Sequence, residues 1–352
     1  MKMHPYLIVL TSFLFLSCAS GMRDYESPNF DRESGRFQHS DGDKHDKSFV
    51  DLFGLAFKYF LREDDAFERN GFPLVKRSKE ELEGFNENVM WVGHASILIN
   101  HAELTVLTDP QFSERASPLS FAGPKRVTPV PFEISDLPKL DVVVISHNHY
   151  DHLDEFSIKQ ISMSQPEVTF LVPLGLRTLL LSWGARNVIE LDWWQSFEIK
   201  GAIFQPTPVQ HWSKRSAFDR NKSLWAGWMV QWQDFSFYFA GDTGYSNDFK
   251  EVSSRLGNPD LAAIPIGAYE PREFMQSAHI TPEEAVVVFK DLNAKYAIGI
   301  HWGTFKLTLE PMNEPPIRLS RELERLGIDK QRFRTLRHGE VWPLYSEGTI
   351  GP

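Results

Sequence analysis

Residues 141–152 read DVVVISHNHYDH, and this stretch decides the fold. The apolar run VVVI is typical of a buried strand, and the histidines follow it almost at once. Alternate side chains of an extended segment share a face, so we expect His147 and His149 to meet one metal ion while Asp151 and His152 face a neighbouring position. Neutral imidazoles and carboxylates are ligands for Zn²⁺, with Fe or Mn as alternatives. A surface histidine tract would not sit between an apolar strand and the start of a helix.

Further histidines and aspartates stand where other predicted strands end. His211 ends the run AIFQPTPVQ, Asp242 ends FSFYFAGD and His301 ends YAIGIH. His94 stands in VGHAS and Asp109 stands in LTDP. Each of them, taken alone, also fits a buried side chain with an ordinary hydrogen bond. Strand ends hold side chains rigidly beside open loops, so together with the histidine-rich stretch these residues indicate one site.

Short runs rich in Val, Ile, Phe, Tyr and Trp begin at residue 88 and are separated by Gly, Pro and Asp. Such runs predict strands, and stretches between them show helical patterns. One of these has a strong helix start, with Thr281 as cap and Pro282 at the first helical position. Strands mixed with helices predict an α/β layered domain. The predicted strands lie in residues 89–99, 103–110, 141–147, 168–173, 187–193, 202–210, 225–232, 235–242, 261–267 and 296–301, and the predicted helices in 154–164, 174–184, 246–257 and 281–294.

The composition excludes several classes of protein. Of the 352 residues, 42% are hydrophobic and 13% aromatic, enough for a large core, so the chain as a whole is not disordered. The formal charge of −10 argues against a nucleic-acid partner, which a basic surface would mark. Cys18 is the single cysteine, which excludes an intrachain disulfide and a cysteine-rich zinc site. A metal site in this chain has to be built from His, Asp and Glu.

Residues 1–17 have the pattern of a signal peptide. An apolar run follows Lys2, and it is too short to span a bilayer. Cys18 and the small residues after it resemble the processing site of bacterial lipoproteins, in which the cysteine is lipidated and becomes the first residue. The resemblance implies an exported lipoprotein of the cell envelope, held on a membrane by its lipid anchor, with the outer membrane favoured. An ordinary signal peptide with an incidental cysteine is the alternative.

Composition divides the rest of the chain into three parts. Residues 18–48 are rich in Ser, Gly, Asp and Arg, which predicts a lipidated cysteine on a flexible tether. Residues 49–85 mix apolar and charged positions and predict an N-terminal extension packed on the domain edge. The strand-rich pattern then predicts one catalytic domain over residues 86–346, a length that single α/β domains reach.

The HxHxDH stretch, followed by a His, an Asp and another His, resembles the metallo-β-lactamase superfamily. The resemblance implies an αββα sandwich with two zinc ions at one edge. His94 and Asp109 match positions that orient ligands rather than bind metal. Carried over residue by residue, the resemblance gives the first ion the ligands His147, His149 and His211, the second ion Asp151, His152 and His301, and both ions the bridging carboxylate of Asp242.

A narrower resemblance covers roughly residues 85–345. Strings such as NVMWVGHASILI, LTDPQFSERASP, SHNHYDHLD and IPIGAYEPREFM resemble the N-acylphosphatidylethanolamine-hydrolysing phospholipases D. The family implies hydrolysis of N-acylphosphatidylethanolamine-like phospholipids to phosphatidic acid and N-acylethanolamine. Two metals sharing a hydroxide would supply the nucleophile at neutral pH, with Asp151 and Asp242 as the catalytic carboxylates. We expect Tyr150 and His279 to contact the substrate.

Other functions fit the same residues. A metal-dependent lactonase or another ester hydrolase uses the same two-metal edge, because function depends on the pocket rather than on the fold. A catalytically silent, metal-stabilised envelope lipoprotein is a further alternative, although every predicted ligand position carries a competent residue. Residues 211–228 combine tryptophans with Lys and Arg. This pattern suits an amphiphile with an anionic head group, or a packed core with solvated cations.

Overall fold

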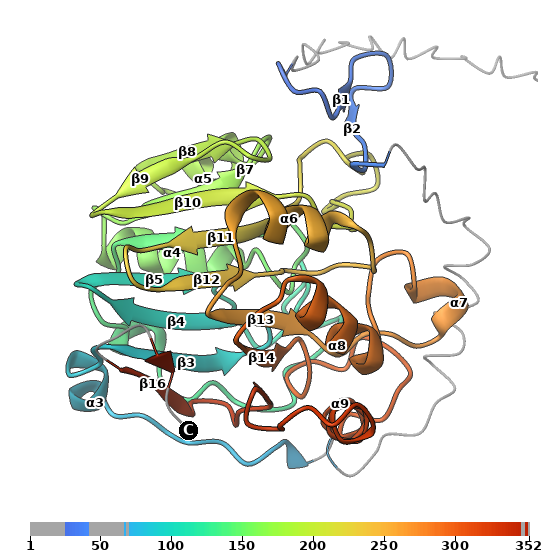
Figure 1. The fold of residues 1–352 in the computed structure, drawn as a ribbon. Coiled ribbons are helices and arrows are strands. Elements are labelled where there is room, and N and C mark those ends of the chain that lie inside the picture. The colour runs from blue at the N-terminus through green and yellow to red at the C-terminus, as the bar shows by residue number, and fades with distance from the viewer. Residues whose placement is uncertain (1–24, 42–66, 68–69, 346–348, 351–352) are drawn as a thin grey trace, which may run out of the picture.

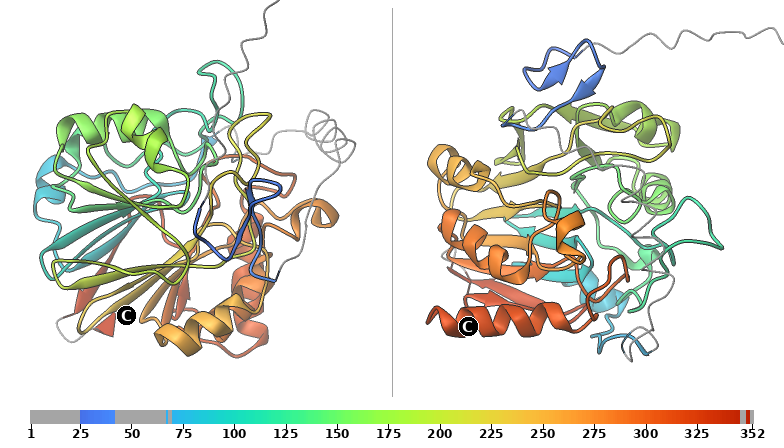
Figure 2. Two further views of the ribbon diagram at one scale, coloured as in Figure 1. Left: turned by 90° about the horizontal axis from the view of Figure 1, so that it is seen from above. Right: turned by 90° about the vertical axis from the view of Figure 1, so that its right-hand side faces the viewer.

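Two β-sheets lie face to face, with helices on both outer faces (Figures 1 and 2). The computed structural model describes residues 25–41, 67, 70–345 and 349–350. One hydrophobic cluster lies between the sheets, and one lies between each sheet and its helices. The αββα sandwich expected from the sequence is therefore confirmed.

One sheet has eight strands, most of them from the first half of the chain. In order across the sheet they are β17 (Thr349–Ile350), β16 (Val341–Tyr345), β3 (Asn88–Gly93), β4 (Ser96–His101), β5 (Leu104–Thr108), β6 (Val142–Val144), β7 (Thr169–Pro173) and β8 (Asn187–Leu191). The strands from β5 to β8 run parallel. The carboxyl ends of β5 and β6 therefore meet at one edge.

The other sheet has seven strands from the second half of the chain. In order they are β15 (Phe333–Arg334), β14 (Tyr296–Ile300), β13 (Leu261–Pro265), β12 (Ser236–Phe239), β11 (Gly227–Gln231), β10 (Ala202–Thr207) and β9 (Phe197–Ile199). β11 is antiparallel to both β10 and β12, and β12, β13 and β14 are parallel. The carboxyl ends of β10, β12 and β14 therefore share an edge.

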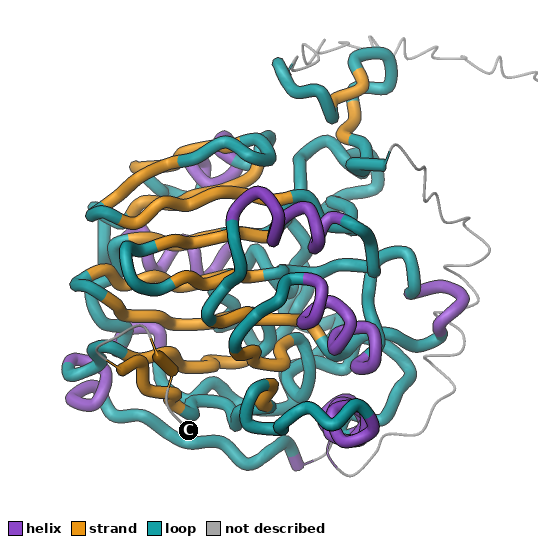
Figure 3. Tube along the Cα trace, in the orientation of Figure 1, coloured by secondary structure: helices purple, strands orange, loops and turns teal. Residues whose placement is uncertain are grey.

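The helices cover the outer faces (Figure 3). Those with buried residues in the cluster under the eight-stranded sheet are α3 (Lys79–Glu83), α4 (Glu155–Ser164) and α5 (Arg177–Ser182), with the short helix η1 (Ile134–Asp136) at its margin. The seven-stranded sheet is covered by α6 (Asp248–Leu256), α8 (Pro282–Asp291) and α9 (Glu314–Arg325), and α7 (Arg272–Met275) precedes α8. Thr281 and Glu284 form a capping box at the start of α8, as the sequence predicted.

Strand β6 is buried on both faces of its sheet, which explains its continuous apolar run. Val142 and Val144 face the core between the sheets, while Val143 and Ile145 face the helix-side cluster. The indole Nε1 of Trp228, on the opposite sheet, donates to the Ile145 carbonyl at 2.9 Å. This buried bond links the two sheets just before the histidine-rich stretch begins.

Part of the segment predicted as a flexible tether is instead packed on the domain. Residues 25–41 contain the short strands β1 (Phe30–Asp31) and β2 (Arg36–Phe37). The Phe37 ring is 1% exposed and lies 5.0 Å from the Phe30 ring. The prediction of a tether over 18–48 is therefore wrong for 25–41, because a few aromatic side chains anchor a segment that is otherwise polar on average.

Several elements have no counterpart in the sequence predictions. These are the helices α3, η1, α7 and α9 and the strands β1, β2, β9, β15, β16 and β17. The described part of the predicted extension 49–85 packs on the domain, with the Phe72 ring 5.3 Å from that of Trp302 and Leu82 fully buried. No helix among the described residues has the length and apolar character to cross a bilayer.

Candidate metal centre

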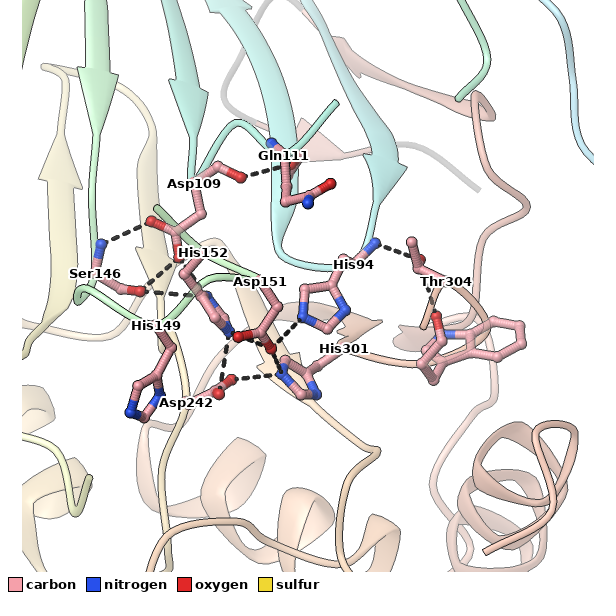
Figure 4. A network of polar contacts seen from close by, with 12 residues as sticks. His94, Asp109, Gln111, Ser146, His149, Asp151, His152, Asp242, His301 and Thr304 are labelled. Carbon is pink, nitrogen blue, oxygen red and sulfur yellow. Dashed lines mark hydrogen bonds and ion pairs between the residues drawn. The ribbon is translucent and has the colours of Figure 1, made fainter. Parts of the chain in front are cut away.

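All of the predicted ligands gather at one edge of the sandwich, at the carboxyl ends of strands from both sheets. Figure 4 shows five of them, namely His149, Asp151, His152, Asp242 and His301. The stretch 147–152 follows β6, and His211, Asp242 and His301 follow β10, β12 and β14. Among the described residues, every group of His and Asp side chains arranged to hold a metal ion belongs to this centre. The structure shows that these side chains lie together, and their role as metal ligands stays a prediction.

The first set consists of His147, His149 and His211. The Nδ1 atom of His149 lies 2.8 Å from His147 Nε2 and 3.1 Å from His211 Nε2. Two nitrogens bound to one tetrahedral zinc, each about 2.0–2.1 Å from it, are roughly 3.3 Å apart. The three nitrogens therefore converge as the ligands of one ion would.

The second set consists of Asp151, His152 and His301. Oδ2 of Asp151 lies 3.4 Å from Nε2 of His152 and 3.4 Å from Nε2 of His301. All three side chains are at least largely buried, and the two histidines are almost fully so. The set brings one carboxylate and two imidazoles together beside the first set.

Asp242 lies between the two sets. Its Oδ2 atom is 3.7 Å from His211 Nε2 and 3.1 Å from His152 Nε2. Its Oδ1 atom is 3.1 Å from His301 Nε2. This is the position that a carboxylate shared by two metal ions has to occupy.

Hydrogen bonds from supporting residues orient the ligands. The Asp109 carboxylate accepts from the main-chain N–H of Ser146 at 2.7 Å and contacts His152 Nδ1 at 2.7 Å. His94 Nε2 lies 2.9 Å from Asp151 Oδ2. Asp109 and His94 thus each contact a predicted ligand, and both also stand in groups of side chains that could hold a metal ion. That they orient ligands rather than bind metal stays a prediction.

The partners of the histidines also fix their tautomers. Nδ1 of His211 contacts the main-chain oxygen of Ala278 at 2.9 Å, so this nitrogen carries the proton. Nδ1 of His152 likewise donates to Asp109. The Nε2 atoms of both rings are left without a proton in the neutral form and point into the centre.

The two sets differ in charge. Burial lowers the pKa of the first-set histidines, to about 4 for His149 and well below the usual range for His147 and His211. Burial opposes charge on the second-set histidines too, but Asp242 and Asp151 outweigh it. The pKa of His152 is therefore well above its usual value, and that of His301 is raised to about 9.

The carboxylates show the converse effect. Burial alone would raise the pKa of Asp151 and Asp242, but the neighbouring histidines hold both well below the usual range. Nε2 of His152, Nε2 of His301 and Oδ1 of Asp242 are buried, and both nitrogens lie within ion-pair distance of the Asp242 carboxylate, but none of the three atoms makes a hydrogen bond of regular geometry. A divalent cation between them would give all three atoms a regular partner. The donor set therefore fits a metal pair.

Of the two predicted substrate contacts, His279 lies beside the centre, with its Nδ1 atom 4.0 Å from Asp242 Oδ2. Tyr150 stands between His149 and Asp151 in the chain and, with Arg215, helps to line a cavity of about 790 Å³ whose lining contains none of the predicted ligands. In the segment 211–228, Trp225 and Trp228 are fully buried and belong to the core, whereas Phe218 is 83% exposed.

Sequence reasoning missed two supports. The Ser146 hydroxyl donates to Asp109 Oδ2 at 2.5 Å and lies 2.9 Å from His147 Nδ1. A serine between an apolar strand and the first histidine is a signal that could have identified it. The Thr304 hydroxyl accepts from the main-chain N–H of His94 at 2.7 Å. No local pattern predicts that contact, because the two residues are far apart in the chain.

Comparison with known proteins agrees with this geometry. The family described as Beta-lactamase superfamily domain matches residues 105–302, more than half of the chain. N-acyl-phosphatidylethanolamine-hydrolyzing phospholipase D 1 of Caenorhabditis elegans is 44% identical over 264 residues, which cover 72% of this chain and 74% of that protein. The mitochondrial N-acyl-phosphatidylethanolamine-hydrolyzing phospholipase D of Saccharomyces cerevisiae is 39% identical over 273 residues, which cover 72% of this chain and 58% of that protein.

A solved structure extends the likeness in fold. The isothiocyanate hydrolase from Delia radicum gut bacteria superimposes with a TM-score of 0.60 at 19% identity, over 74% of this chain and 99% of that one. At this identity the likeness concerns the fold alone. The chain is a metal-dependent hydrolase of the metallo-β-lactamase superfamily and belongs to the family within it that contains the Caenorhabditis elegans phospholipase.

Proposed function

We propose that the chain is a zinc-dependent phosphodiesterase of the phospholipase D type, which hydrolyses N-acylphosphatidylethanolamine-like phospholipids to phosphatidic acid and N-acylethanolamine. The observation that carries the proposal is the position of Asp242 between two complete ligand sets. Two bound zinc ions would lower the pKa of water to about 7 and neutralise charge on the phosphoryl oxygens. The names of the nematode and yeast relatives support this reaction and substrate class.

The residues of the chain prepare the site for that chemistry. Asp109 and the Ala278 carbonyl take the Nδ1 protons of His152 and His211, so that the opposite nitrogens are free to bind metal. Asp151 stays ionised because the histidines beside it lower its pKa. An ionised carboxylate of low pKa suits a ligand that also orients the attacking water, rather than a group that stores its proton.

The cavity beside Tyr150 supports an amphiphilic substrate. Its walls include the apolar side chains of Leu119, Phe156 and Trp183 as well as the cation of Lys159. Apolar walls suit acyl chains, and an ammonium group suits a phosphate or another anionic head group. This combination favours a phospholipid over a small polar ester.

The proposal is tested on vesicles that contain N-acylphosphatidylethanolamine, with the products identified by mass spectrometry. We expect phosphatidic acid and N-acylethanolamine in equal amounts, and elemental analysis should find close to two zinc ions per chain. Lactones and carboxylic esters are assayed in parallel. Turnover of these compounds without phosphodiester cleavage would replace the proposal by an ester hydrolase, and a metal-bound protein inactive on every substrate would indicate a silent lipoprotein.

We also propose that Cys18 is lipidated and attaches the chain to a membrane of the cell envelope, with the outer membrane favoured. Residues 1–24 lie outside the described residues, so the support is the sequence pattern alone. Mass spectrometry of the mature N-terminus should find a lipidated Cys18, and Cys18→Ser should move the protein out of the membrane fraction. An unmodified cysteine would contradict the anchor without affecting the catalytic proposal.

A further inference from the structure

Arg215 joins the two chain segments that carry His149 and His211, two of the three residues of the first ligand set. Its Nη1 atom donates to the main-chain oxygens of Asn148 at 3.0 Å and of Leu153 at 2.6 Å. These oxygens stand at the two ends of residues 148–153, which we call the ligand loop because three predicted ligands lie in it. One guanidinium therefore ties both ends of the ligand loop to residues 211–215, the His211 segment.

Other contacts reinforce this tie. The main-chain N–H of Lys214 donates to Asn148 Oδ1 at 2.7 Å, and the Tyr150 hydroxyl donates to the Arg215 carbonyl at 2.8 Å. The guanidinium carbon of Arg215 lies 4.0 Å from the Tyr150 ring and 5.1 Å from the Trp183 ring. Bonds that run in both directions fix the separation of the segments, and stacking on the rings fixes the guanidinium plane.

The hydrogen bonds of Arg215 lie close in the chain to His149 and His211, two ligands of the first set. His149 follows Asn148 directly, and His211 begins the segment that ends at Arg215. His149 Nδ1 lies 3.1 Å from His211 Nε2, so each of the two segments brings one ligand nitrogen to the same place. We propose that Arg215 is a positioning residue, which sets the separation of these two histidines and through it the affinity for the first metal ion.

The charge of Arg215 and its positioning role predict opposite changes in metal affinity when the side chain is removed. A cation close to a metal site repels a dication, so by Coulomb's law the removal of that cation should strengthen metal binding. Loss of the tie should weaken binding, because the ligand loop and the His211 segment would no longer be held at the right separation. The sign of the change in affinity therefore separates a positioning role from an electrostatic one.

The experiment compares Arg215→Met with the unchanged chain. Both proteins are stripped of metal and titrated with Zn²⁺ against a competing chelator. Loss of a residue that orients ligands typically weakens metal binding about 10- to 100-fold, and we expect that loss for one of the two ions only. Binding of the other ion should change by less than about threefold, because no second-set ligand lies in the His211 segment and the separation of the two segments therefore does not enter its geometry.

Two further backgrounds assign the weakened ion. In His301→Ala, which leaves the first set complete, Arg215→Met should still weaken binding by the same factor. In His211→Ala, which already disrupts the first set, the added effect of Arg215→Met should vanish. An equal effect in both backgrounds would overturn the assignment to the first ion.

Control variants separate the tie from charge and from folding. Arg215→Lys keeps the charge but lacks the planar fork that stacks on Tyr150, so it should not restore the affinity. Arg255 lies on α6, and its guanidinium carbon is 4.4 Å from the centre of the Trp194 ring. The control variant Arg255→Met removes this guanidinium and should bind zinc like the unchanged chain. If Arg215→Met does not fold, Asn148→Ala removes the acceptor for Lys214 and should weaken the same ion by a smaller factor.

The outcomes also separate this inference from the proposed function, on whose metal ligands it rests. An unchanged chain that binds no zinc would remove the proposed ligands themselves. An unchanged chain that binds two zinc ions, together with an Arg215→Met variant of equal or higher affinity, would overturn the positioning role alone. Weakened binding that Arg215→Lys restores in full would show that charge, not geometry, is the cause.

Discussion

The two halves of the molecule hold their metal ligands in different ways. The half around the eight-stranded sheet supplies its ligands from one stretch, residues 147–152, directly after β6. The other half supplies His211, Asp242 and His301 after three separate strands (Figure 1). A stretch of turns has no ladder of main-chain hydrogen bonds to fix it, so its side chains need braces, whereas a strand end is already held by its sheet.

The hydrogen bonds follow this division. In the half around the eight-stranded sheet, the buried carboxylate of Asp109 accepts hydrogen bonds from Ser146 and His152. In the half around the seven-stranded sheet, the partner of His211 is the main-chain oxygen of Ala278. A substitution can remove a side-chain brace but not a carbonyl, so the two halves should respond differently to mutation.

The largest effect should come from Asp242, where the two halves meet. Asp242→Asn keeps the shape of the side chain but removes the charge shared by both sets. We expect turnover to fall by more than the roughly 100-fold that loss of a supporting residue costs, and zinc to fall below two per chain. Phosphodiester hydrolysis and elemental analysis measure both effects, and retained turnover would contradict a bridging role.

The side-chain brace should matter next. Asp109→Asn leaves an amide that cannot accept from both Ser146 and His152 as the carboxylate does. We expect zinc affinity and turnover to fall about 10- to 100-fold. Ala278→Gly is the matched change in the other half, where the carbonyl that binds His211 remains. Similar losses in both variants would erase the distinction between the halves.

The same division explains how much of the site the sequence could predict. The ligands in residues 147–152 form a local pattern with strand spacing, and the strand-end histidines were found because each follows an apolar run. The contacts of Thr304 with His94 and of Arg215 with the ligand loop depend on how distant segments pack. No periodicity within one segment carries that information.

The fold shows the same limit. Strands with dense apolar runs, such as β6 and β12, were predicted in place. Helix α9 was not predicted, although Pro315 and Pro316 mark its first turn and the buried Leu319 and Leu323 stand one helical turn apart, because these few apolar side chains stand among many charged ones. The hairpin at 25–41 was predicted as tether because its anchor is a few aromatic rings rather than a run.

The opposite pKa shifts of the two sets predict different pH dependences for metal binding. The first-set histidines have lowered pKa values and are neutral at pH 7, so a metal ion displaces almost no protons there. His301, with a pKa raised to about 9, is protonated at pH 7 and has to release its proton when metal binds. Affinity for the second ion should therefore fall at least about tenfold per unit as pH drops from 9 towards 7.

Zinc titrations at pH 7, 8 and 9, in a buffer that reports proton release, measure this difference. Affinity for the first ion should stay nearly constant over the same range, since its histidines are already neutral. Equal slopes for the two ions would mean that Asp242 and Asp151 do not hold charge on the second set in the way the pKa shifts indicate.

The smallest effect on zinc affinity should come from Ser146, whose hydroxyl connects the Asp109 carboxylate to His147. Ser146→Ala removes the hydroxyl that lies 2.9 Å from His147 Nδ1, but Asp109 keeps the main-chain N–H of residue 146 and His152 as partners. One hydrogen bond is worth about 1 kcal/mol net, so zinc affinity should fall by about fivefold. Ser162→Ala is the control, because its buried hydroxyl on α4 has no partner and its loss should leave zinc binding unchanged. A loss for Ser146→Ala as large as that for Asp109→Asn would show that the serine, rather than the carboxylate, is the main support of the first half.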